Sequence, residues 1–108
     1  MDIERRISSR APVHLYFNKY IDGHPHLCEA VELSMTGMLV RRIHEPDASR
    51  ACYAVEIASP ELETKGRLWM CASPVWQQGQ FEALSFVGQS HFDRMRLADL
   101  LASTRAAA

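Results

Sequence analysis

Three arginines stand close together near the start of the chain, in the pattern Arg5-Arg6-x-x-x-Arg10. The planar guanidinium group pairs bidentately with phosphate oxygens, and its flat face stacks on aromatic rings. The chain as a whole has a formal net charge of -1, which argues against a general affinity for DNA or RNA. A local cluster of this kind suits a small anionic ligand better than a long polyanion.

A second short motif, Glu32-x-Ser34-x-x-Gly37, supplies an acidic group, a hydroxyl and a glycine. Each motif alone has an ordinary explanation. A run of charges is usually a solvated tail, and serine and glycine occur in the turns of any β-protein. Glu32 fits a plain surface carboxylate as well as it fits a ligand contact. The functional prediction therefore depends on the two motifs occurring together.

In this order, followed by several short strands and one closing helix, the two motifs resemble the PilZ domain, a bacterial receptor for cyclic di-GMP. The resemblance covers the chain from about Glu4 to Leu101. It implies a ligand-binding module rather than an enzyme, with cyclic di-GMP as ligand and no further cofactor. It also implies an unidentified effector protein as partner, and a part in second-messenger signalling that controls motility or biofilm formation.

The resemblance gives the arginines distinct roles. Arg6 and Arg10 would contact guanine edges and phosphates, since a guanidinium group can pair with guanine O6 and N7. The additional Arg5 is similar to that of family members that hold an intercalated dimer of the ligand. Ligand would draw this polar N-terminal segment onto the rest of the domain and so create a new surface for the partner protein.

The second motif would contact the other side of the ligand. Glu32 could accept hydrogen bonds from guanine N1–H and N2–H₂, Ser34 could donate or accept one, and Gly37 would leave the turn without a Cβ against the ligand. The family usually has Asp or Asn at the position of Glu32. Glutamate keeps the acceptor chemistry but is one methylene longer, so it must fold back or displace the base. Trp76 could stack on an exposed base, although packing in the core or in a hairpin is its commoner role.

Two other functions remain open. The first is a PilZ-like adaptor that binds a protein and has lost the nucleotide, a reading that the unusual Glu32 favours. The second is a small barrel that binds single-stranded nucleic acid. The slightly acidic charge and the lack of spread aromatic and basic residues speak against it.

The first half of the chain predicts a pair of strands. Residues 11–18 alternate, with Val13, Leu15 and Phe17 on one face, and Asp22-Gly23 supplies the chemistry of a reversal. The next strand, about 25–33, is expected to point Leu27, Val31 and Leu33 inward, with Glu29 out of pattern and Glu32 and Ser34 together on the opposite face.

Further strands are predicted at 38–42, 51–57, 68–77 and 80–87. The last two form a hairpin around Gln78-Gly79, and Pro74 should interrupt the first of them. Ser90 and Asp93 are spaced as a capping box at the start of a helix over 91–103. Its broad apolar surface includes the leucines Leu97, Leu100 and Leu101, which leaves association into a homodimer open.

These elements predict a mainly β fold: a small six-stranded antiparallel barrel of the split-barrel type with a C-terminal α-helix. We expect one PilZ-like domain over residues 1–108. It consists of a flexible arginine-bearing segment at 1–10, the barrel at 11–87 and the helix at 90–103.

Composition limits the remaining classes of function. No apolar run is long enough to span a membrane, and no signal peptide is recognisable, so we expect a cytoplasmic protein. Cys28, Cys52 and Cys71 are odd in number and widely spaced, so we expect buried free thiols. His24 and His26 lack further ligands at a recognisable spacing, so we expect no metal site. No catalytic arrangement is convincing.

Overall fold

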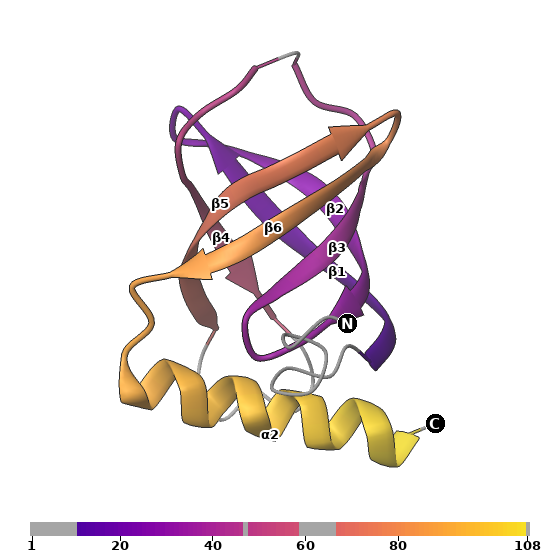
Figure 1. The fold of residues 1–108 in the computed structure, drawn as a ribbon, viewed down its shortest axis with the longest axis vertical. Helices are drawn as coiled ribbons and strands as arrows, with labels where there is room; N and C mark the ends of the chain where they lie inside the picture. The colour runs from indigo at the N-terminus through magenta and orange to yellow at the C-terminus, as the bar shows by residue number, and fades with distance from the viewer. Residues whose placement is uncertain (1–10, 47, 59–66, 108) are drawn as a thin grey trace, which may run out of the picture.

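Six strands and one helix build the part of the chain that the computed structural model describes, residues 11–46, 48–58 and 67–107. In chain order they are β1 (Ala11–Ile21), β2 (His24–Leu33), β3 (Gly37–Arg42), β4 (Tyr53–Ile57), β5 (Leu68–Gln78), β6 (Phe81–Val87) and α2 (His91–Ala107). The strands close into an antiparallel barrel in the order β1-β2-β3-β6-β5-β4, and α2 lies across one end (Figure 1). The predicted six-stranded barrel with a C-terminal helix is confirmed.

The hydrophobic core fills the barrel and extends beneath the helix. The strands point mostly alternate side chains inward, and fully buried examples are Leu33, Val40, Val55 and Leu68. Three leucines of α2 close the end of the barrel: Leu97, Leu100 and Leu101. Burying a side chain of this size stabilises the fold by about 1.5–3 kcal/mol, so the helix is held mainly by this leucine contact.

The predicted turns are confirmed. Asp22 and Gly23 both have positive φ, 51° and 83°, as a tight hairpin between β1 and β2 requires. The β5–β6 hairpin turns at Gly79, also with positive φ. In β5 the pairing register with β6 shifts between Pro74 and Trp76, which confirms the predicted interruption at the proline.

The capping box also forms. The Asp93 amide donates to Ser90 Oγ over 3.0 Å, and the Ser90 amide donates to Asp93 Oδ2 over 3.4 Å. Both groups satisfy amides that a helix N-terminus leaves without partners. The helix runs to Ala107, four residues beyond the predicted end at 103.

The inward face predicted for β2 is wrong in part. Cys28, Ala30 and Leu33 are buried, whereas Leu27 is 50% exposed and Val31 is half-buried. The register with β3 shifts between Ala30 and Glu32, so β2 contains a bulge that changes which side chains face inward. Simple alternation across the whole strand could not predict this change.

The prediction of buried thiols holds for one cysteine only. Cys28 is fully buried, but Cys52 and Cys71 are exposed. Cys71 lies between Met70 and Ala72, which both point inward, so its own side chain points outward.

Candidate functional site

The pairing of β1 with β2 brings the start of β1 to the second motif. Ala11 is the Cα partner of Leu33, and Pro12 is the partner of Glu32. The residue that precedes Ala11 is Arg10, so the arginine motif is joined to the barrel beside Glu32. Arg5, Arg6 and Arg10 themselves lie outside the described residues, as does the whole segment 1–10 that was predicted to be flexible.

The turn from Ser34 to Gly37 connects β2 to β3 and is organised by the serine. Ser34 Oγ accepts hydrogen bonds from the amides of Thr36 and Gly37, each at 3.2 Å, and the Ser34 amide donates to the Gly37 carbonyl over 2.9 Å. Ser34 is only 3% exposed, whereas Glu32 is half-buried on the outer face. The expected common direction of the two side chains is therefore not observed. Ser34 shapes the turn, and a direct ligand contact by its hydroxyl stays a prediction.

Gly37 lies directly against the backbone of β6. A Cβ added to Gly37 would lie 2.2 Å from the carbonyl oxygen of Leu84, which is backbone and has little freedom to move. The turn is also tied to β6 by a hydrogen bond from the Phe86 amide to the Thr36 carbonyl over 2.8 Å. Packing of β3 against β6 therefore requires a glycine at position 37, and the sequence alone did not reveal this requirement.

A row of side chains crosses the outer face of the barrel next to this turn. Glu32 on β2 pairs with Leu39 on β3, Leu39 pairs with Ala83 on β6, and Ala83 pairs with Trp76 on β5. Directly paired residues share a face of the sheet, and Trp76 is 45% exposed. We call these four residues the outer row. It places a carboxylate and an indole on one continuous wall, separated by two smaller apolar side chains.

A polar cluster that sequence reasoning missed lies beside the outer row. Glu29, Arg41 and Phe81 follow one another across β2, β3 and β6. Arg41 Nε and Nη2 lie 2.8 and 2.6 Å from Glu29 Oε1, and His14 Nδ1 lies 2.5 Å from Glu29 Oε2. The hydrogen bond from Arg41 is the main cause that holds the pKa of Glu29 below its ordinary value. Glu29 interrupts the apolar pattern predicted for β2, and this interruption was the one sequence signal that could have predicted the cluster.

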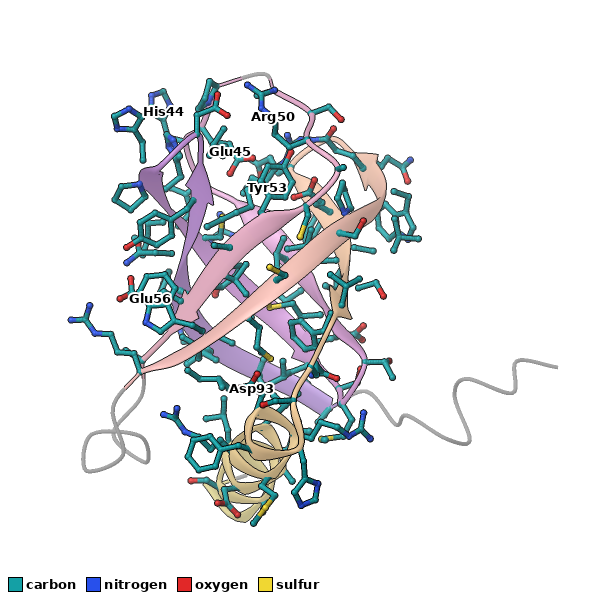
Figure 2. The ribbon with its side chains drawn as sticks, turned by 90° about the vertical axis from the view of Figure 1, so that its left-hand side faces the viewer. His44, Glu45, Arg50, Tyr53, Glu56 and Asp93 are labelled. Atoms are coloured by element: carbon teal, nitrogen blue, oxygen red, sulfur yellow. The ribbon has the colours of Figure 1, made fainter. Side chains whose placement is uncertain are left out.

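A second charged cluster is buried at the barrel end opposite the helix, where Figure 2 shows Glu45 and Tyr53. Lys19 is 1% exposed, and its Nζ lies 2.6 Å from Glu45 Oε1 and 2.9 Å from Glu82 Oε1. Desolvation lowers the pKa of Lys19, but hydrogen bonds to the two carboxylates outweigh it, so the net pKa is raised above 10.5. The Tyr53 ring lies 4.6 Å from the ammonium nitrogen. This cluster holds the connection between β3 and β4 onto the barrel.

Within the described ranges, no group of three or more His, Cys, Asp and Glu side chains is arranged to hold a metal ion. Among the described residues, no helix is long and apolar enough to cross a bilayer.

The fold and the outer row define a small closed β-barrel with a helix over one end and a mixed polar and aromatic outer wall. The fold is that of a PilZ domain. The PilZ domain of YcgR from Escherichia coli, solved with c-di-GMP, is similar with a TM-score of 0.68 and 16% sequence identity, over 95% of this chain and 93% of that one. An uncharacterized protein of Legionella is similar with a TM-score of 0.57 and 17% identity, over 91% of this chain and 95% of that one.

Comparison with protein-family models finds no match, and comparison with curated protein sequences finds none either. The likeness is therefore one of three-dimensional structure, and the resemblance predicted from the two motifs is confirmed at the level of the fold.

Proposed function

We propose that this protein is a receptor for cyclic di-GMP that binds the ligand between its N-terminal arginines and the outer row. Arg6 and Arg10 contact guanine and phosphate, Arg5 extends the site to a second ligand molecule, and Glu32 and Trp76 contact the opposite side. The main observation in support of this proposal is the register of β1 with β2. It places the start of β1, which follows the arginine motif in the sequence, beside Glu32.

The reach of the chain supports this proposal. An extended chain spans about 3.3–3.6 Å per residue, so Arg6 lies within roughly 18 Å of Ala11 along the backbone. Both guanidinium groups can therefore reach the outer row, whose Glu32 neighbours the start of β1. Trp76 offers an exposed aromatic face, and base–aromatic stacking is worth about 1–3 kcal/mol.

The fold likeness supports the same ligand. The PilZ domain of YcgR was solved with c-di-GMP, and it shares the arrangement of strands and helix over nearly the whole of this chain. Since the sequences are only 16% identical, the likeness supports the choice of ligand through the fold, and the residues of this chain must supply the contacts.

The energetics favour a coupling between binding and ordering of the N-terminal segment. Fixing about five residues costs on the order of 5–10 kcal/mol, at about 1–2 kcal/mol each. Three arginine contacts return about 1–3 kcal/mol apiece. The two sums nearly cancel, so the net affinity depends on stacking and on the preformed turn. We propose that the ordered segment then presents the surface that an effector protein recognises.

Calorimetric titration with cyclic di-GMP tests the proposal. Saturable binding is expected in the wild type, and Arg6→Ala or Arg10→Ala should abolish it. The matched control is Arg50→Ala: this arginine pairs with Asp22 near the barrel end opposite the helix, so its removal should leave binding unchanged (Figure 2). A fitted stoichiometry of two ligands per protein that falls in Arg5→Ala would support the dimeric ligand.

Hydrogen exchange tests the coupling. Amides of residues 1–10 should gain protection when ligand is added, and those of β4 should not change. Binding without such protection would refute the switch but not the receptor.

The second candidate is an adaptor that keeps the barrel and binds a protein without a nucleotide. Glu32, longer than the usual family residue, is the observation that favours it. No heat at high micromolar cyclic di-GMP, from protein whose fold is confirmed by circular dichroism, would decide for the adaptor.

A further inference from the structure

We propose that Cys52 and Cys71 form a dithiol that a peroxide oxidises to an intramolecular disulfide between the start of β4 and β5. This inference concerns the side of the barrel formed by β4 and β5, and it does not depend on ligand binding. Both thiols are exposed, in contrast to the buried Cys28.

The strand register places the two thiols close together. Ala54 is the Cα partner of Cys71, and Tyr53 is the partner of Ala72. Cys52 is two residues from Ala54, so its side chain lies on the same outer face as that of Cys71. Extending this register by one residue makes Cys52, the residue before β4, a diagonal neighbour of Cys71 on β5.

The chain before β4 is held against β5, which fixes the position of Cys52. Ser73 Oγ donates to the Ala51 carbonyl over 2.7 Å, so the contact between the two segments continues past the end of β4. The Tyr53 hydroxyl accepts from the Arg50 amide over 3.0 Å and donates to the Ala48 carbonyl over 3.3 Å. Cys52 therefore meets Cys71 as part of an ordered segment.

The protonation behaviour agrees with this proximity. Partial desolvation and then a hydrogen bond with Cys71 raise the pKa of the Cys52 thiol. The β4–β5 register, which brings the two cysteines to one outer face, agrees with an interaction between the thiols. The raised pKa keeps the Cys52 thiol protonated to a higher pH than an ordinary thiol. Cys71 is placed first in the reaction because it lines the cavity described next.

Cys71 has room for a small oxidant. It lines a cavity of about 290 Å³ together with Trp69, Val87 and Gln89, among other residues of β5, β6 and the approach to α2. Hydrogen peroxide is far smaller than this cavity and can approach the sulfur from it. Cys28 differs in both respects, because it is fully buried and burial raises its pKa to about 12.

The reaction proceeds in two balanced steps. The Cys71 thiolate attacks one peroxide oxygen, the O–O bond breaks, and the hydroxide that leaves takes up the thiol proton as water. The Cys52 sulfur then attacks the sulfenic acid of Cys71, the S–S bond forms, the S–O bond breaks, and the Cys52 proton leaves with hydroxide as a second water. Two thiols are oxidised to one disulfide, and one peroxide is reduced to two waters.

The geometry predicts a disulfide that is easily reduced. Diagonal neighbours in a sheet have Cα atoms about 7–8 Å apart, somewhat more than the usual separation in disulfides. The start of β4 must therefore shift toward β5, and a strained bond of this kind is reversible under mild reducing conditions.

Peptide mapping after treatment with hydrogen peroxide tests the proposal in the wild-type protein. Trypsin cleaves after Lys65 and Arg67, which separates Cys52 from Cys71 unless a disulfide joins them. The expected product is a linked pair of peptides that dithiothreitol separates, with Cys28 still alkylated as a free thiol. In Cys52→Ser, dimedone should label a sulfenic acid at Cys71, and in Cys71→Ser labelling at Cys52 should be much slower.

Two results would overturn the proposal. One is recovery of Cys52 and Cys71 in separate peptides, whether reduced or over-oxidised, after complete consumption of the peroxide. The other is a disulfide between two protein molecules, seen as a dimer on a non-reducing gel, in place of the intramolecular link.

Discussion

Replacing Gly37 by alanine should separate the start of β3 from β6. The added Cβ would lie 2.2 Å from the Leu84 carbonyl oxygen and 3.2 Å from its carbon, so one strand must retreat by about 1 Å to restore an ordinary contact. Overpacking of this kind costs about 1–3 kcal/mol. The movement also strains the hydrogen bond from the Phe86 amide to the Thr36 carbonyl, worth about 1 kcal/mol. We expect a total loss of about 2–4 kcal/mol.

Urea unfolding followed by circular dichroism measures this loss. The matched control is Gly88→Ala, because Gly88 has a φ of 64° and open space where its Cβ would be. That variant suffers only backbone strain, about 1–2 kcal/mol. Hydrogen exchange at the Phe86 amide should accelerate in Gly37→Ala and stay unchanged in the control. A Gly37→Ala protein within 0.5 kcal/mol of wild type, taking about 0.5 kcal/mol as the range of neutral surface changes, would refute the packing role of this glycine.

Three further predictions concern stability. Lys19→Met removes the buried cation that Glu45 and Glu82 share, so urea unfolding should show a loss of about 3–5 kcal/mol, and adding Glu82→Gln should recover part of it. Because the folded pKa of Lys19 lies above its ordinary 10.5, its stabilising effect is complete below that value and is lost as the pH rises through the folded pKa. The urea midpoint of the wild type should therefore fall above about pH 10.5 more steeply than that of Lys19→Met, and equal slopes would contradict this cause. Ser90→Ala removes the helix cap and should cost about 1 kcal/mol, while the exposed Ser49→Ala should be neutral.

Local signals in the sequence predicted the turns, the helix start and the number of strands. Asp22-Gly23 and the Ser90–Asp93 pair act through their own backbone, so their chemistry needs no distant partner. The bulge in β2 depends on how β2 meets β3, and it moved Leu27 to the surface against expectation. The burial of Lys19 depends on two carboxylates far away in the sequence, and no single strand pattern contains that information.

The candidate site was predictable to a similar degree. The motif residues were predicted from their resemblance to the PilZ motifs, but the role of Ser34 in organising the turn and the contact of Gly37 with Leu84 required the structure. Arg41 was missed because an arginine at the end of a strand looks like an ordinary surface charge until its contact with Glu29 is known.

The closure of the barrel restricts how another protein can be recognised. Each described strand has a hydrogen-bonded neighbour on both sides over at least part of its length, so none of the described strands offers a complete free edge to an incoming peptide. We therefore expect recognition to use mainly side chains, loops or the helix. Specificity for a partner can therefore change through single surface substitutions while the hydrogen-bonded framework stays intact.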